Sequence, residues 1–200
     1  MNESTVIVID NGHGNNTPGK RSPNWDRGVY YEYAGNRNVA RHLAELLTAL
    51  RVPNKILVPE IYDVPIPERN KRIKALGKDN KGNIFVISIH SDAYETPAAK
   101  GFSVFTKPGK DAADPVATVI YDTAKLHFPG RNFRPDTTDG DPDKEANFLI
   151  LTGHNFPAVL VELFFMTNRL DYELLTSPSG PRRLAAMLAD SILKARSQNE

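Results

Sequence analysis

The chain has 200 residues, with 25 basic against 24 acidic side chains and no cysteine. This length is typical of one domain with one substantial core. The near-zero net charge argues against nucleic acid or an anionic membrane surface as a partner. The lack of cysteine excludes disulfides, thiolate metal ligands and a cysteine nucleophile.

The amino terminus reads MNESTVIVID, without a basic segment and with an apolar run too short for a signal peptide. No window approaches the roughly 20 apolar residues of a membrane span. We therefore expect no membrane insertion. We also expect the protein to be a monomer. The chain is expected either to be made in the cytoplasm without a leader or to be a mature form from which a leader was removed.

The first half of the chain alternates apolar runs with helical patterns. TVIVID is typical of a strand buried on both faces, and the Gly, Asn and Pro-rich stretch over residues 11–24 predicts a loop. Apolar residues then recur at helical spacing from Glu32 to Leu50, before Pro53. KILVPE predicts a strand, and PERNKRIKAL predicts a helix that ends just before Gly77.

The second half continues the alternation. NIFVISI and GFSVFTK predict strands, residues 111–126 predict a helix, and residues 128–145 predict a long connection. NFLIL and AVLVELFF predict the last two strands. Two helices follow, the first with Asn168 as its N-cap. The order predicts an α/β fold: a single domain with a mainly parallel twisted sheet of about six strands and helices on both faces.

Four side chains that can bind a metal or carry a proton lie at the ends of predicted strands, at the start of a helix or within a strand. His13 follows the first strand, His90 ends the third, Glu32 opens the first helix and Glu162 interrupts the apolar run AVLVELFF. The carboxyl ends of parallel strands meet at one edge of a sheet, where such folds bind ligands. We therefore expect His13 and His90 to lie close together.

Two imidazoles and one carboxylate can hold a catalytic Zn²⁺ with a fourth position left for water. His13, Glu32 and His90 can supply that set. Glu162 would be costly inside an apolar strand unless it is paired, protonated or close to a metal. We therefore expect it to act as the general base that takes a proton from the water and returns it to a leaving amine.

The motifs resemble the zinc-dependent N-acetylmuramoyl-L-alanine amidases, a family of bacterial cell-wall and phage lysis enzymes. The matching pieces are IVIDNGHG, EYAGNRNVARHLAELL, SIHSDA and PAVLVELFFMTN, in that order between Val6 and Leu175. The segments PGKRSP and FFMTN are more similar to the phage and prophage branch. After the histidine of the first motif, the family more often carries two glycines and an acidic residue than the HGNN found here.

The resemblance implies Zn²⁺ bound by His13, Glu32 and His90, with catalysis by Glu162. It implies hydrolysis, by zinc-activated water, of the amide between the lactyl group of N-acetylmuramic acid and L-alanine. Peptidoglycan would be the substrate and the cell wall the place of action. Residues 1–200 are expected to form the catalytic domain, with no separate wall-binding domain.

Other readings of the same residues stay open. A zinc carboxypeptidase or deacetylase would use the same site, and a catalytically silent peptidoglycan-binding module would keep the fold. His154 is the reserve metal ligand, whereas His42 and His127 are expected to be solvated or locally bonded. Asp92 is expected to bond within its loop.

Three further groups have candidate roles at the rim. Arg21, Arg131 and Arg134 are candidates for a stem-peptide carboxylate, and residues 128–145 for a lid. Aromatic residues flank the motifs, and packing or stacking on the substrate is open for each: Trp25, Tyr30, Tyr31, Tyr33 and Tyr94.

Overall fold

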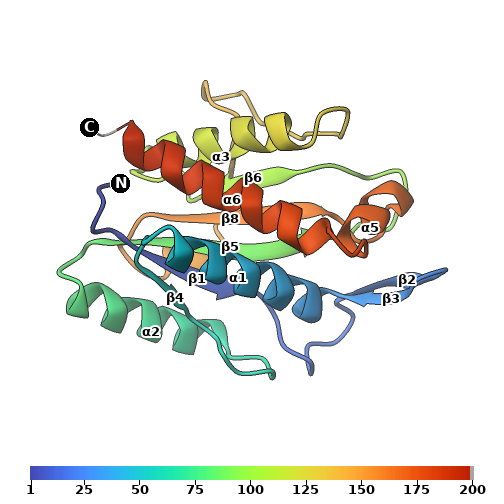
Figure 1. Ribbon diagram of the computed structural model, residues 1–200, viewed down its shortest axis with the longest axis horizontal. Coiled ribbons are helices and arrows are strands. Elements are labelled where there is room, and N and C mark those ends of the chain that lie inside the picture. The colour runs from blue at the N-terminus through green and yellow to red at the C-terminus, as the bar shows by residue number, and fades with distance from the viewer. Residues whose placement is uncertain (199–200) are drawn as a thin grey trace.

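The computed structural model describes residues 1–198, in which one six-stranded sheet carries helices on both faces (Figure 1). The spatial order of the strands is β4-β1-β5-β8-β6-β7. They are β1 (Val6–Asn11), β4 (Asn54–Ile56), β5 (Ile84–Asp92), β6 (Ser103–Thr106), β7 (Lys144–Glu145) and β8 (Ala158–Phe165).

The sheet is mainly parallel, as the sequence predicts. Strands β4, β1, β5 and β8 all run in one direction. Strand β6 is antiparallel to β8, and β7 follows β6 in parallel. Strands β1, β5 and β8 are buried at nearly every position because helices cover both of their faces. The carboxyl ends of β1 and β5 therefore lie next to each other.

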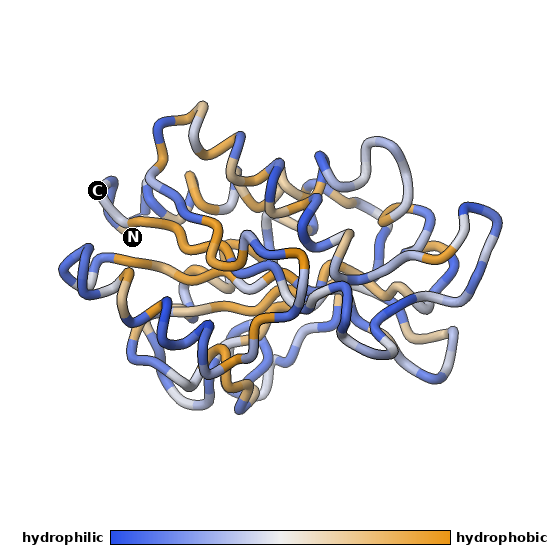
Figure 2. Tube along the Cα trace, turned by 90° about the horizontal axis from the view of Figure 1, so that it is seen from below, coloured by the Kyte–Doolittle hydropathy of each residue, from blue (hydrophilic) through white to orange (hydrophobic). Residues whose placement is uncertain are grey.

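Two helical layers enclose the sheet, and the apolar strands run between them (Figure 2). Helix α6 packs against both α1 and α3 on one face, and α5 contacts β8 and α6. Helices α2 and α4 lie on the other face with a second apolar core. The helices are α1 (Glu32–Ala49), α2 (Ile66–Asp79), α3 (Asp114–His127), α4 (Leu149–Thr152), α5 (Arg169–Leu175) and α6 (Gly180–Ser197).

The segment NFLIL is not a strand, contrary to the prediction. Residues 149–152 form the short helix α4, and Ile150 and Leu151 are buried in the second core. The side chain of Asn70 on α2 donates to the carbonyl of Leu149 at 2.9 Å. A short apolar run does not distinguish a strand from one buried helical turn, so contacts with α2 decide the outcome. The strand beyond β6 is the two-residue β7, which lies at the end of the predicted connection over residues 128–145.

Two further differences concern glycine and turn chemistry. Part of the predicted loop over residues 11–24 forms a hairpin of β2 (Arg21–Trp25) and β3 (Gly28–Tyr31) beside the sheet (Figure 1). Helix α2 continues through Gly77 to Asp79 rather than ending before it. A Cβ atom on Gly77 would lie 2.0 Å from Cζ of Phe156, so glycine is needed there for close packing.

The terminal helices match the predictions. The side chain of Asn168 accepts hydrogen bonds from the backbone of Leu170 and Asp171, as an N-cap does. Over residues 1–198, no helix combines the length and apolar character needed to cross a bilayer.

Candidate metal centre

His13 is presented by a sharp turn directly after β1. Its backbone has a φ of +65°, a left-handed conformation that is uncommon for a residue with a side chain. A Cβ atom on Gly12 would lie 2.2 Å from Cε1 of His90, and one on Gly14 would lie 1.9 Å from the backbone nitrogen of Asp63. Both glycines are therefore required for the close approach of this turn to its neighbours.

Two arginines stabilise this turn, one by a direct hydrogen bond and one through other residues. The guanidinium of Arg37 on α1 donates to the carbonyl of His13 at 2.8 Å and to the carbonyl of Glu60. Arg69 on α2 is 1% exposed and forms ion pairs with Asp10 and Asp63, each at 2.7 Å.

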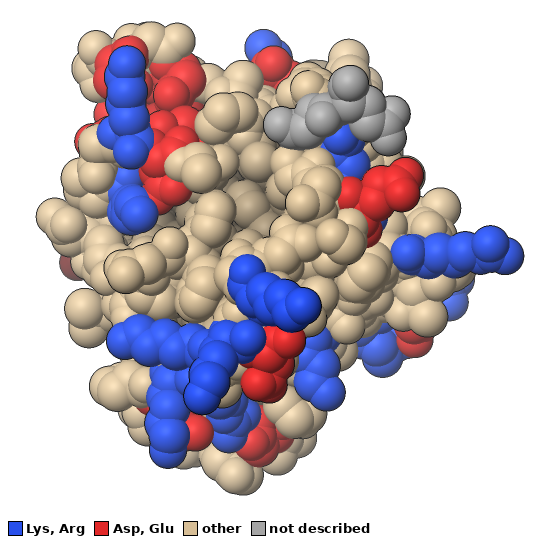
Figure 3. All heavy atoms as spheres, turned by 90° about the vertical axis from the view of Figure 1, so that its left-hand side faces the viewer, with Lys and Arg blue, Asp and Glu red and all other residues tan. Residues whose placement is uncertain are grey.

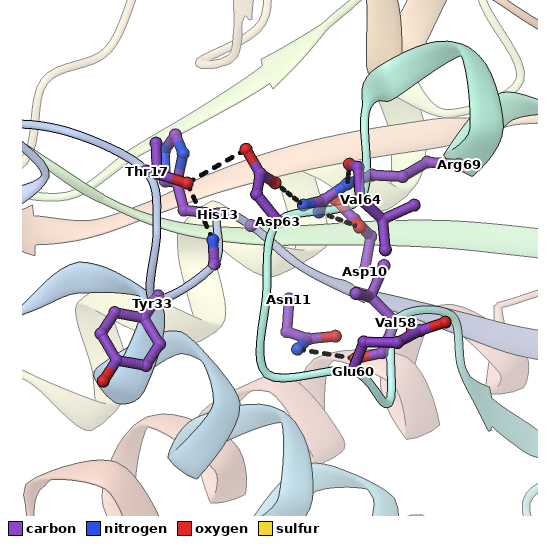
Figure 4. A network of polar contacts seen from close by, with 12 residues as sticks. Asp10, Asn11, His13, Thr17, Tyr33, Val58, Glu60, Asp63, Val64 and Arg69 are labelled. Carbon is purple, nitrogen blue, oxygen red and sulfur yellow. Dashed lines mark hydrogen bonds and ion pairs between the residues drawn. The ribbon is translucent and has the colours of Figure 1, made fainter.

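The second arginine reaches the turn through a relay of hydrogen bonds (Figure 4). Asp63, which pairs with Arg69, accepts from the hydroxyl of Thr17 at 3.0 Å. That hydroxyl in turn accepts from the backbone nitrogen of Gly14 at 2.9 Å. The strained conformation of His13 is thus fixed by charged and polar contacts from both α1 and α2.

Glu32 is the first residue of α1 and is 1% exposed. Its Oε1 atom lies 3.1 Å from Nδ1 of His90 and 3.4 Å from Nε2 of His13. It also accepts from the backbone nitrogen of Ser91 at 3.2 Å. Burial tends to raise the pKa of this carboxyl, but hydrogen bonds from His13 and then His90 outweigh it and hold the pKa well below its usual range.

The three side chains converge as the sequence predicts. One ligand atom from each of His13, Glu32 and His90 lies within 4.8 Å of the others, and among the described residues no other such group of three occurs. The two imidazole rings meet edge to face, with centroids 4.8 Å apart. The buried Oε2 atom of Glu32 has no hydrogen-bond partner within residues 1–198. Two imidazole nitrogens and one carboxylate, whose second oxygen is buried and unpartnered, are a donor set that fits Zn²⁺.

Glu162 lies next to this group, on β8. It is the register partner of His90 on β5, and one of its oxygens is buried without a hydrogen-bond partner in the described chain. Burial raises the pKa of Glu162 well above its ordinary value, and the nearby charges of Glu32 and Asp92 raise it further. Lys20 and Arg134 act in the opposite direction. The carboxyl is therefore poised to hold a proton.

Asp92 forms a hydrogen bond within its loop, as expected, and also contacts the segment over residues 128–145. Its carboxylate accepts from the backbone of Ala93 at 2.8 Å and from Arg134 at 3.1 Å. Arg134 also stacks on the ring of Phe165, 4.8 Å from its centroid. Arg131, by contrast, is bound to the carbonyl of Leu170, and Arg21 lies on the hairpin. Among these arginines, Arg134 is the one whose charge reaches Glu162. The lid role of residues 128–145 stays a prediction.

The remaining histidines have local partners. His154 precedes β8 and so lies toward the edge opposite the metal group, where its Nδ1 accepts from the backbone of Phe156. It is not a member of the ligand group, and its candidacy as a reserve ligand is wrong. His42 contacts Glu45, and His127 contacts Asp190.

The aromatic residues divide between packing and exposure. The ring of Trp25 packs edge to face on Tyr172, 4.5 Å between centroids, and the hydroxyl of buried Tyr30 lies 3.1 Å from that of Ser91. Tyr31 is 46% exposed and Tyr94 is 63% exposed. The last two are available to a ligand.

Two supporting residues, Asn36 and Arg69, have no role that the sequence alone predicts, although Asn36 lies within the segment EYAGNRNVARHLAELL. Asn36, one turn after Glu32, donates to the carbonyl of Gly12 and to Glu32. A signal for Asn36 exists in hindsight, because it lies on the same helical face as the buried residues Val39 and Leu43. Arg69 has no such signal, because its partners are distant in the sequence.

The chain matches the family model described as N-acetylmuramoyl-L-alanine amidase over residues 7–194. The chain belongs to this amidase family. The match includes all four residues predicted for the site and nearly the whole fold.

Curated relatives and solved structures of amidases agree with this assignment. The chain is 28% identical to the amidase AmiC of Neisseria meningitidis over 94% of its own length, and 27% identical to a probable cell wall amidase, LytH, of Staphylococcus epidermidis over 85%. This chain spans about half the length of each of these two relatives, 51% in both cases.

The fold is also that of solved amidases. It superposes on the amidase of Clostridium difficile 630 with a TM-score of 0.82 at 20% identity, covering 99% of this chain and 100% of that one. For AmiC2 of Nostoc punctiforme the TM-score is 0.80 at 22% identity, with 98% and 99% covered.

Proposed function

We propose that this member of the amidase family hydrolyses peptidoglycan at the amide between the lactyl group of N-acetylmuramic acid and L-alanine. The observation that carries the proposal is the position of Glu162 beside the convergent group of His13, Glu32 and His90. Family membership points to the same reaction. The cell wall is then the place of action, and because one chain supplies all four residues, we propose that it acts as a monomer.

His13, Glu32 and His90 are the proposed ligands of Zn²⁺. A zinc ion with three protein ligands acidifies a water in its open position and polarises a carbonyl oxygen. Glu32 brings the negative charge of the set, since its pKa is held low. Ser91 and Asn36 orient that carboxylate through their hydrogen bonds to it.

Glu162 is the proposed proton carrier. Its carboxylate takes the proton from the attacking water and delivers it to the nitrogen of the leaving L-alanine, so the amide breaks into a carboxylic acid and an amine. A raised pKa favours this role because the protonated form must persist until the amine leaves. Arg134 and Lys20, whose charges reach Glu162, limit how far its pKa rises.

A cavity of about 370 Å³ lies beside the turn that carries His13. It is lined by residues 15–21, most of which are polar, and by Tyr31 and Tyr33. Rings of tyrosine pack well against the apolar faces of sugars, while amide side chains bond their hydroxyls. We propose that part of the glycan strand binds here.

Digestion of purified peptidoglycan, with mass analysis of the products, tests the proposal. We expect free stem peptides that begin with L-alanine and glycan strands that keep their length. The variant His90→Ala should lose both zinc and product formation. The matched control His127→Ala, which alters a histidine paired only with Asp190 at the surface, should keep both.

Other products would identify the alternatives. Stems shortened at their carboxyl ends would indicate a carboxypeptidase, and release of acetate would indicate a deacetylase. Binding of peptidoglycan without any product, by a zinc-loaded protein, would indicate a silent module. Each of these outcomes contradicts the amidase proposal.

A further inference from the structure

Acidic side chains gather at a second place, away from the metal group. Strand β6 is antiparallel to β8, so Ser103 lies beside Glu162 while Thr106 lies toward the opposite edge. The loop after Thr106 leads into α3, and the loop before β7 lies against it. Together they supply the acidic cluster, which consists of Asp111, Asp114, Asp139, Asp141, Asp143 and Glu145.

The cluster borders a hollow at the surface. Five of its members line a cavity of about 560 Å³: Asp111, Asp114, Asp139, Asp141 and Glu145. On the face shown in Figure 3, acidic side chains gather in the upper left with Lys or Arg side chains lying across them, and a larger group of Lys and Arg side chains lies in the lower part. Lys107 pairs with Asp111 at 2.8 Å, and Lys110 also lines the cavity. Within residues 1–198, the other carboxylates of the cluster form no ion pair.

Asp143 is the member that is hardest to explain without a ligand. It is 3% exposed, and its Oδ2 atom accepts from the hydroxyl of Thr106 at 2.6 Å. Its Oδ1 atom is buried and has no hydrogen-bond partner in the described chain. Asp141 lies beside it, since Oδ1 of Asp141 accepts from the backbone nitrogen of Asp143 at 3.3 Å and the Asp141 carboxyl raises the pKa of Asp143. An unpaired buried carboxylate beside a second one is unfavourable unless a proton or a cation lies between them.

Asp114 repeats this pattern on the facing element. Its Oδ2 atom accepts from the backbone of Asp111 at 2.8 Å, while its Oδ1 atom is buried without a partner. Asp114 and Asp141 both raise the pKa of Asp143, after burial itself. Two buried, unpartnered oxygens thus come from different segments: Asp114 lines the hollow, and Asp143 lies behind Asp141, which also lines it.

The spacing of the loop residues indicates the kind of cation. Asp139, Asp141 and Asp143 alternate along the chain, with Gly140 at a φ of +111° between the first two. Calcium loops place their first three oxygen ligands at this i, i+2, i+4 spacing. Lys144 stands where such loops have glycine, so the remaining ligands must come from elsewhere. The available donors are all oxygens, which favours a hard cation with six to eight ligands.

We propose that the acidic cluster binds one Ca²⁺ ion. Asp139, Asp141 and Asp143 supply the ligands from the loop, and Asp114 and Glu145 complete the set. Since the structure brings three ligand atoms within 4.8 Å only at the His13 group, among its described residues, calcium must draw these side chains inward. Binding would then fasten the loop before β7 to the start of α3.

Calcium titration of the zinc-loaded protein tests the proposal, because the His13 group is then already filled. We expect one Ca²⁺ per chain by calorimetry, with a Kd below about 1 mM, together with a rise in Tm. The same concentration of MgCl₂ should produce a smaller shift. Asp141→Asn, at a partly exposed residue, should weaken calcium binding at least about tenfold by loss of a ligand charge.

The control is Asp122→Asn, which changes an exposed carboxylate of α3 outside the cluster. It should bind calcium as the wild type does. The proposal is overturned if the wild type shows neither heat nor a Tm shift up to about 10 mM CaCl₂, beyond the weakest protein sites. It is equally overturned if Asp141→Asn binds calcium like the wild type, or if magnesium has the same effect as calcium.

Discussion

Glu162 lies directly beside His90, because the two residues are register partners on the parallel strands β8 and β5. On its other side Glu162 is paired with Ser103 of the antiparallel strand β6. Backbone hydrogen bonds of two ladders therefore fix the proposed proton carrier relative to a proposed metal ligand. A site built on strands holds its geometry more tightly than one built on loops.

Glu162→Gln should separate proton transfer from metal binding. We expect the variant to bind zinc normally, since Glu162 is not in the ligand group, and to lose about 100-fold or more in turnover, as removal of a general base does. Zinc content and the rate of peptide release measure the two effects. Glu173→Gln, at a partly exposed residue of α5, is the control. Full turnover by Glu162→Gln would exclude the role.

Arg37→Ala should loosen the turn that carries His13. The guanidinium bonds the carbonyls of His13 and Glu60, so its loss frees a strained backbone that it holds. We expect zinc affinity to fall by about 10 to 100-fold, as for other groups that orient a ligand. A competition titration with a zinc chelator measures it.

The matched control is Arg41→Ala, one turn further along α1. Arg41 is exposed and bonds only side chains of its own helix, among them Glu45. It should keep the zinc affinity of the wild type. Equal affinities for all three proteins would show that Arg37 does not position His13.

The sequence was sufficient for the elements that are set by local chemistry. Continuous apolar runs identified β1, β5 and β8, and the strand ends placed His13 and His90 on one edge. The N-cap at Asn168 followed from the residue type alone. Glu32 required the resemblance, because an acidic residue in a first helical turn is common for electrostatic reasons.

Contacts between distant segments set what the sequence did not predict. NFLIL becomes a helical turn because Asn70 on α2 binds its backbone, and Gly77 stays inside α2 because Phe156 packs on it. The sequence pattern predicts Arg69 as an ordinary surface residue of a helix. In the structure its guanidinium donates to Asp10, which is 59 positions away in the sequence. Periodicity carries no information about such pairs.

Arg69→Met should destabilise the whole fold. Asp10 is fully buried, and its other oxygen accepts from Ser88 at 2.6 Å, so removal of the arginine leaves a charge without compensation. We expect a loss of about 3–5 kcal/mol in the free energy of unfolding, measured by urea denaturation.

Arg72→Met is the matched control for that variant. Arg72 follows Arg69 by about one helical turn on α2 and pairs with Glu60 near the surface. Its loss should cost about 1 kcal/mol or less, since partly solvated ion pairs contribute little. Similar losses for both variants would contradict the importance of the buried pair.

The acidic cluster should make stability fall as pH rises in protein freed of calcium. Burial, and then the carboxyl of Asp141, raise the pKa of Asp143 to about 7, while an unfolded aspartate titrates near 3.9. Because the folded-state pKa is the higher one, the folded state binds the proton more tightly. The stabilisation that this bound proton gives to the folded state is complete below about pH 4 and is lost as pH rises through about 7.

Asp143→Asn removes this titration while the hydroxyl of Thr106 keeps an acceptor. Between about pH 5 and pH 8, we expect the wild type to lose unfolding free energy relative to the variant. Urea denaturation of both proteins in the presence of a calcium chelator measures the difference. Asp141 and Asp114 face the same carboxyl, and both raise its pKa. A difference between the two proteins that stays constant with pH would contradict the raised pKa of Asp143.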